Sequence, residues 1–245
     1  MIHYHGGPIW PEQSGAVIWK GRHGFVSFAR SEQIGVIADA CQSFAVDNGA
    51  FTAWKAGKKF DYAGYEDFVE SWMRHPGFDW CLIPDVIDGD EAENLELVDS
   101  WELPKSMSVP VWHLHESMEY LEYLVKRFPR VAFGSSGEYG TPNTKKWWER
   151  MNVAMKVACN AAGEPRCKLH GLRMLNPAVF TKPPFASADS TNVAQNAKDS
   201  RKWYGSYKPP NNTSRGCLLA DRIEAHNSAA IWNQKPIQQD MWMGI

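Results

Sequence analysis

Long apolar runs are absent from this chain, and none approaches the roughly 20 residues that a membrane-spanning helix needs. Its first residues, MIHYHGGPIW, lack the basic and then apolar layout of a signal peptide. The cysteines are few, odd in number and scattered, and none forms a C-x-x-C pair. This pattern argues against a zinc ribbon or a disulfide framework and favours reduced thiols. We therefore expect a cytoplasmic protein that does not enter a membrane.

Strong charge of either sign is also lacking, because 26 basic residues face 28 acidic ones and the net charge is −2. No overall field would draw the protein onto nucleic acid. Two local stretches, TKKWWER (144–150) and KDSRKWYGSYK (198–208), nevertheless interleave cations with aromatic residues. Such stretches suit a phosphate backbone with stacked bases, although a solvated helix face is the simpler explanation of each. The candidate nucleic-acid contacts are Lys145, Lys146, Arg201, Lys202 and Arg215.

Short apolar runs typical of strands alternate with amphipathic stretches typical of helices. Strands are predicted near 2–5, 24–29, 43–47, 78–84, 109–114, 130–134, 168–172 and 184–188. Helices are predicted at 62–74, 90–100, 117–128 and 143–159. About eight strands joined by helical crossovers predict a closed (β/α)8 barrel of the TIM type, in the α/β class.

One domain is expected over residues 1–245, since no repeat, low-complexity tract or long linker interrupts the chain. The Pro- and Asn-rich segment YKPPNNTSRG (207–216) is interpreted as a surface loop, and 217–233 as a final helix.

Three aspartates each follow a predicted strand and stand beside small or turn-forming residues. They are Asp47 in DNGAF, Asp85 in IPDVIDGD and Asp189 in SADSTN. Carboxyl ends of barrel strands carry the active sites of this fold, so the three carboxylates are expected to share one pocket. Asp47 capping its turn and Asp189 capping the next helix are the plain structural alternatives.

Other strand ends carry further candidates. His113 and His115 form an H-x-H that suits either a metal or hydrogen bonding in a pocket. Small residues in GSSGE (134–138) favour a backbone cradle or simply a tight turn. With His3, His5, His170 and Asp189, the H-x-H also permits a metal-dependent barrel hydrolase, which is the rival function.

Taken in order, these segments resemble the tRNA-guanine transglycosylase superfamily. The family's Asp-Ser-Gly-Gly-aromatic motif is similar to Asp47–Phe51, and its second, base-reading aspartate to Asp85. The Val-Gln-Gly strand end falls on 112–117 with His115 at the glutamine, and the Gly-Leu-Ala-Val-Gly-Glu segment on 131–138. The His-x-Leu segment is similar to His170–Leu172, and the late nucleophile to Asp189.

The resemblance implies a barrel enzyme that exchanges guanine in a nucleic acid for a free 7-deazaguanine base. Asp189 would be the nucleophile and Asp47 the general acid and base, without cofactor or metal. Base-binding residues would be Asp85, Phe51, His113, His115, Gly134, Ser135, Ser136, His170 and Met174.

The chain also departs from the family pattern. It lacks the Cys-x-Cys-x2-Cys zinc subdomain and the extra C-terminal elements of the tRNA enzymes, so it most resembles the phage-type branch that modifies DNA. DNA is the preferred partner and tRNA the alternative. A homodimer is possible, as the family often forms one.

Overall fold

The computed structural model describes residues 1–87, 89–199, 203 and 205–233. Its strands are β1 Ile2–Gly6, β2 His23–Ser27, β3 Ser43–Asp47, β4 Phe78–Leu82, β5 Ser108–Val109, β6 Val111–His113, β7 Arg130–Gly134, β8 Lys168–Gly171 and β9 Ser187–Ser190. Its helices are α1 Glu12–Trp19, α2 Ile34–Ala40, α3 Ala50–Lys55, α4 Tyr62–Trp72, α5 Glu91–Ser100, α6 Met118–Arg127, α7 Lys145–Ala158, α8 Pro177–Phe180, α9 Asn192–Asn196 and α10 Asn212–Glu224, with 3-10 turns at Phe28–Arg30 and Gly137–Tyr139.

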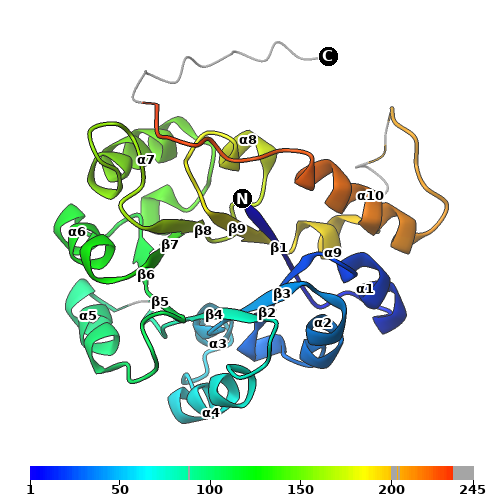
Figure 1. Cartoon of the computed structure of the whole chain (residues 1–245), viewed down its shortest axis with the longest axis horizontal. Coiled ribbons are helices and arrows are strands. Elements are labelled where there is room, and N and C mark those ends of the chain that lie inside the picture. The colour runs from blue at the N-terminus through cyan, green and yellow to red at the C-terminus, as the bar shows by residue number, and fades with distance from the viewer. Residues whose placement is uncertain (88, 200–202, 204, 234–245) are drawn as a thin grey trace.

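Parallel pairing joins the strands in the order β5-β4-β3-β2-β1-β9-β8-β7-β6. The two end strands of this order, β5 and β6, are consecutive in the chain and separated only by Pro110. Proline has no N–H for the ladder, so the single strand expected at 109–114 is split. The Pro110 carbonyl still accepts a hydrogen bond from the Ala132 N–H at 2.9 Å. The ring therefore closes through residues 108–113, and the predicted TIM-type barrel is confirmed (Figure 1).

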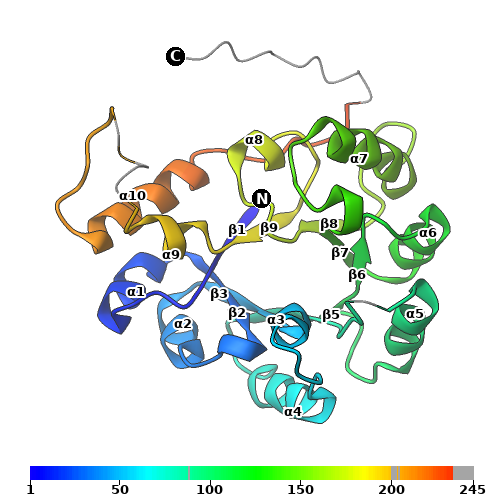
Figure 2. The same cartoon turned by 180° about the vertical axis from the view of Figure 1, so that it is seen from behind.

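Apolar side chains pack against both faces of the barrel sheet. Inside the ring lie mainly Tyr4, Phe25, Trp80, Leu82, Val109 and Val111. A larger cluster packs the strands against the helices that surround them, as both end-on views show (Figures 1 and 2). The core thus fixes the strand ends, where the polar residues lie.

Helix boundaries follow local capping. Ser117 caps α6 by accepting a hydrogen bond from the Tyr120 N–H at 3.0 Å. Asp90 and Glu93 form a capping box that starts α5. In the part of the chain that the structure describes, no helix is long and apolar enough to cross a bilayer.

The predicted final helix is misplaced. α10 begins at Asn212 rather than at 217, because the Asn211 side chain accepts a hydrogen bond from the Ser214 N–H at 2.8 Å and caps the helix earlier. It ends at Glu224, so residues 225–233 are not helical. The loop expected at 207–216 accordingly stops at Asn211.

Candidate active site

The three aspartates lie at the carboxyl ends of their strands. Asp47 is the last residue of β3, Asp85 follows β4 by three residues, and Asp189 lies within β9. Asp47 pairs in register with Ser27 of β2, and Asp189 with Tyr4 of β1. All three therefore line the same rim of the barrel.

Asp189 is held from one side only. Its Oδ1 accepts a hydrogen bond from the Arg173 N–H at 2.9 Å and lies 3.3 Å from the His170 Nε2. Among the described residues, none donates a hydrogen bond to its Oδ2. The residue is buried, with 4% of its surface exposed. One carboxylate oxygen is thus anchored while the other is available for bonding to a carbon atom.

Asp47 is half-buried, and its environment disfavours the ionised form. Burial raises its pKa to about 6, and the charges of Asp189 and Asp85 add to that shift. The Ser27 hydroxyl and the Arg173 charge oppose it. A carboxyl group with such a pKa exchanges protons readily near neutral pH.

The DNGA turn after Asp47 fixes the neighbouring side chains. Gly49 has a φ of 77°, and a Cβ there would lie 2.8 Å from the Ala29 backbone nitrogen. Only glycine fits that approach without strain. The Asn48 side-chain amide, oriented by this turn, donates to the Ile83 carbonyl at 2.9 Å and to the Asp85 Oδ1 at 2.8 Å. β3 and β4 are thereby linked at their ends.

His113 pairs with Asp85 at the same rim. The His113 Nε2 lies 3.1 Å from the Asp85 Oδ2, and its Nδ1 lies 3.5 Å from the Glu116 Oε1. Burial lowers the pKa of His113, but the bonds to Asp85 and Glu116 outweigh it and raise the pKa to about 10. His113 is therefore an imidazolium at neutral pH, and both of its ring nitrogens face carboxylates.

Glu116 is a member of this cluster that the sequence did not reveal. It is buried, and it accepts hydrogen bonds from the Asn94 side chain at 3.0 Å and the His113 N–H at 2.6 Å. The Arg150 Nε donates to the Leu114 carbonyl at 2.6 Å and holds the same loop. The sequence feature that could have identified Glu116 is an acid three residues after a strand-end histidine, because a turn at that spacing brings the two side chains together.

Phe51 and Arg173 cover the rim beside Asp189. Phe51 is 38% exposed, and the Arg173 guanidinium lies 4.4 Å from the centre of its ring. Arg173 adopts a φ of 57°, which turns its N–H toward Asp189. The sequence analysis named Phe51 as a base-binding residue but missed Arg173, because nothing local predicts a left-handed arginine.

The loop after β7 contributes two hydroxyl groups. The Ser135 Oγ accepts a hydrogen bond from the Trp147 Nε1 at 2.9 Å, and the Ser136 Oγ lies 2.7 Å from the His115 Nδ1. His115 is exposed and lies beyond the end of β6, with its ring 5.8 Å from that of His113. The two histidines are neighbours, and only His115 presents a free ring edge to solvent.

Three of the residues expected to contact the base are buried. Gly134 is buried, and its carbonyl already accepts a hydrogen bond from the Leu114 N–H at 2.9 Å. His170 is fully buried, and its two ring nitrogens lie against the Ser187 Oγ and the Asp189 Oδ1. Met174 is fully buried in the outer core, because the tight turn after β8 directs it away from the rim.

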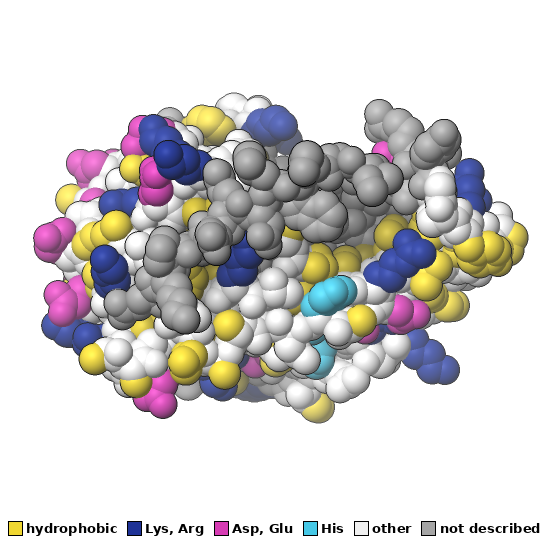
Figure 3. Space-filling view, turned by 90° about the horizontal axis from the view of Figure 1, so that it is seen from above, with side chains coloured by type: hydrophobic (Ala, Val, Ile, Leu, Met, Phe, Trp, Pro, Cys, Tyr) yellow, Lys and Arg dark blue, Asp and Glu magenta, His cyan; other side chains and the backbone are white. Residues whose placement is uncertain are grey.

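The candidate phosphate contacts differ in their surroundings. Lys145 is exposed, 3.8 Å from Glu149, and Lys146 pairs with Glu138 beside the loop after β7. Arg215 donates to the Pro209 carbonyl at 2.8 Å and to that of Pro210 at 3.2 Å, so it is occupied in holding its own loop. Arg201 and Lys202 lie outside the described residues. Where side chains are coloured in Figure 3, cations and acids are intermixed.

The ligands of the rival metal site are not brought together. His3 and His5 lie outside the ring, where their Nε2 atoms approach the His226 carbonyl at 2.9 Å and the Glu224 Oε1 at 2.8 Å. Neither shares a site with His113. The described ranges contain no group of three or more His, Cys, Asp or Glu side chains arranged to hold a metal ion.

The rim thus combines an anchored carboxylate, a carboxyl group that titrates near neutrality and an acid held by an imidazolium. Neither a family model nor a curated protein matches the chain, so these comparisons do not show a family.

Proposed function

We propose that this protein is a base-exchange transglycosylase that replaces guanine in DNA with a 7-deazaguanine base. The observation that carries the proposal is the placing of Asp47, Asp85 and Asp189 on one barrel rim, with Asp47 electrostatically coupled to both others. Each carboxylate has a different environment, and such differences assign different chemical roles. The resemblance of the strand-end motifs to the transglycosylase superfamily supports the same reaction.

Asp189 attacks the sugar. Its Oδ2 bonds to C1′ of a nucleotide flipped out of the strand, and the C1′–N9 bond to guanine breaks. The bonds that Oδ1 accepts from Arg173 and His170 hold the carboxylate in place during the attack. The sugar is then covalently attached to Asp189, and the phosphodiester backbone stays intact.

Asp47 carries the proton in both directions. In its protonated form it protonates the departing guanine, which leaves Asp47 ionised. The ionised carboxylate then removes the N9 proton from the incoming base, whose N9 attacks C1′ and releases Asp189. A pKa of about 6 keeps both forms of Asp47 populated near neutral pH.

Asp85 reads the base. An ionised carboxylate accepts hydrogen bonds from the adjacent N–H groups that guanine and its 7-deaza analogues share. His113 and Asn48 hold the Asp85 carboxylate in position, and the exposed His115 is adjacent to His113. Phe51 stacks on the ring once Arg173 moves aside or shares the face.

Incubation with a radiolabelled 7-deazaguanine base and either duplex DNA or tRNA tests the proposal. We expect label in DNA with the wild type and none with Asp189→Asn. The matched control is Asp67→Asn, which changes an exposed acid of α4 and should leave incorporation unaltered. Label in tRNA alone would correct the polymer, and full activity of Asp189→Asn would overturn the mechanism.

A further inference from the structure

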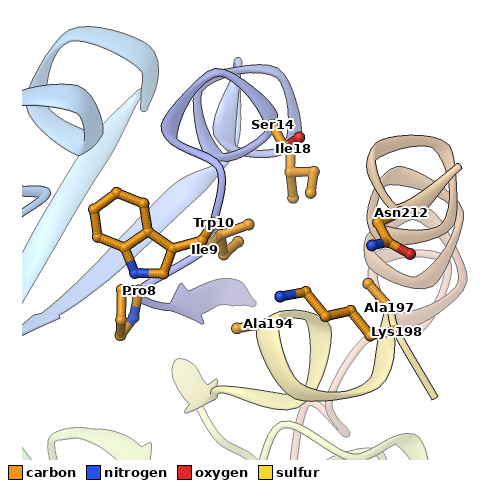
Figure 4. A pocket seen from close by; sticks show the side chains of 9 residues that line it. All are labelled: Pro8, Ile9, Trp10, Ser14, Ile18, Ala194, Ala197, Lys198 and Asn212. Atoms are coloured by element: carbon orange, nitrogen blue, oxygen red, sulfur yellow. The ribbon is translucent and has the colours of Figure 1, made fainter.

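A small cavity of about 60 Å³ opens beside α9, the helix that follows the strand carrying Asp189. Its walls are the loop that follows β1, including Pro8 and Trp10, and the end of α9 with Lys198. Asn212, the first residue of α10, completes it. Figure 4 shows Lys198 extending across the cavity, with Trp10 and Pro8 on one side and Asn212 on the other.

The groups around this cavity are unusual in having few partners. Trp10 is 47% exposed and contacts no aromatic ring or cation among the residues that the structure describes. Lys198 is exposed and forms no ion pair within the described part of the chain. Asn212 accepts a hydrogen bond from Arg215 through its Oδ1 at 3.0 Å, which leaves its side-chain N–H groups free to donate. A flat aromatic face, a free cation and an amide donor therefore surround one hollow.

These three features match the parts of a nucleotide. Bases stack on exposed aromatic rings regardless of their identity, and lysine binds phosphate as a point charge. The cavity is small, so it suits a phosphate group with its ester oxygens rather than a whole base. The base would instead lie on the open face of Trp10.

The position of the cavity relative to Asp189 indicates which nucleotide it would bind. The loops after β1 and β9 lie side by side, because the two strands pair in register from Ile2 with Ser187 to His5 with Ser190. A nucleotide flipped toward Asp189 stays joined to its neighbours by single phosphodiester links. We infer that the cavity binds the phosphate next to the flipped nucleotide and that Trp10 stacks the adjoining base. This inference rests on the proposed function.

The cavity and Trp10 would then bind the DNA strand independently of the base next to the flipped nucleotide. Stacking is tolerant of base identity, and Lys198 contacts a group common to all nucleotides. We therefore expect Trp10 and Lys198 to contribute affinity for the strand and Asp85 to contribute the choice of base.

Fluorescence anisotropy with a labelled nine-nucleotide single-stranded DNA carrying a central guanine tests the inference. The measurements use the Asp189→Asn chain, so that no reaction occurs. Adding Trp10→Ala should raise the Kd roughly 5- to 150-fold, whereas Trp10→Phe should retain most of the affinity. Adding Lys198→Ala should raise the Kd and reduce the slope of log affinity against log salt by about 1. Lys20→Ala, at the opposite end of the barrel, is the charge control and should change neither.

The outcomes separate this inference from the proposed function. If wild type exchanges guanine but Trp10→Ala and Lys198→Ala leave the Kd and the salt slope unchanged, the cavity does not bind the strand. If wild type exchanges no guanine but both substitutions weaken DNA binding as described, the cavity binds nucleic acid and the proposed reaction is wrong. Equal thermal melting of the variants, whose altered side chains are exposed, checks that each one folds.

Discussion

Replacing Asp47 with Asn should stabilise the protein while it abolishes base exchange. Burial, together with the charges of Asp189 and Asp85, raises the pKa of Asp47 to about 6. In the unfolded chain an aspartate has a pKa of about 3.9. The difference of about 2 pH units corresponds to about 3 kcal/mol that wild type loses when Asp47 ionises in the folded state.

The sign of this effect depends on pH. Below pH 4 the group is protonated in both states, and the ionisation cost is absent. As the pH rises from 4 to 6, the unfolded state loses its proton first, so the free energy of unfolding of wild type falls. Asparagine stays neutral throughout. The advantage of Asp47→Asn is thus expected to grow from about 1 kcal/mol at pH 4.5 to about 3 kcal/mol at pH 8.

Urea unfolding followed by tryptophan fluorescence at pH 4.5, 6 and 8 measures this difference. Asp67→Asn, on the exposed face of α4, is the control and should change stability by less than about 0.5 kcal/mol at every pH. An Asp47→Asn advantage that is independent of pH, or that shrinks as pH rises, would show that the pKa of Asp47 is not raised in the folded protein.

Three further predictions concern the same rim. Gly49→Ala should destabilise the protein and slow base exchange, because the added Cβ would collide with Ala29. Gly57→Ala is the control and should cost only about 1 kcal/mol, because the space around its Cβ is open, whereas Gly49→Ala should cost about 1–3 kcal/mol more. Urea midpoints and exchange rates measure both effects. In single-turnover experiments, guanine release should slow above pH 6 and attack by the incoming base should slow below it, because the two steps need opposite forms of Asp47; parallel profiles would contradict that role. His113→Gln should lose about 2–4 kcal/mol of stability at pH 7. The deficit should shrink as the pH rises from about 6.5 to 10, because the unfolded chain loses its histidine proton first and the folded wild type only near pH 10. A deficit constant with pH would refute the ion pair.

The barrel was predictable because each strand is a short apolar run bounded by turn residues. β3, with its three consecutive buried residues and terminal Asp47, has the predicted bounds. Pro110 is visible in the sequence. The place where the ring closes is not, because it depends on which distant strands pair with residues 108–113. α10 was misplaced because residues 207–216 were interpreted as a loop, although Asn211 acts as a cap.

The site was predictable only as far as strand ends reveal it. Asp47, Asp85 and Asp189 follow apolar strands, so their common rim follows from the fold. His170 is buried against Tyr4, Phe25 and Trp80 inside the barrel and Met174 in the outer core, and no local pattern predicts either packing. Arg173 and Glu116 reach the site through turns, and their roles became visible only with the backbone in place.

The most direct test of the central claim is the mass of the intact protein after incubation with a short guanine-containing DNA and rapid acid quenching. The account predicts an adduct equal to the DNA without one guanine, attached to wild type and absent from Asp189→Asn. An adduct of the same mass on Asp189→Asn, or guanine released by wild type with no adduct at any quench time, would contradict it.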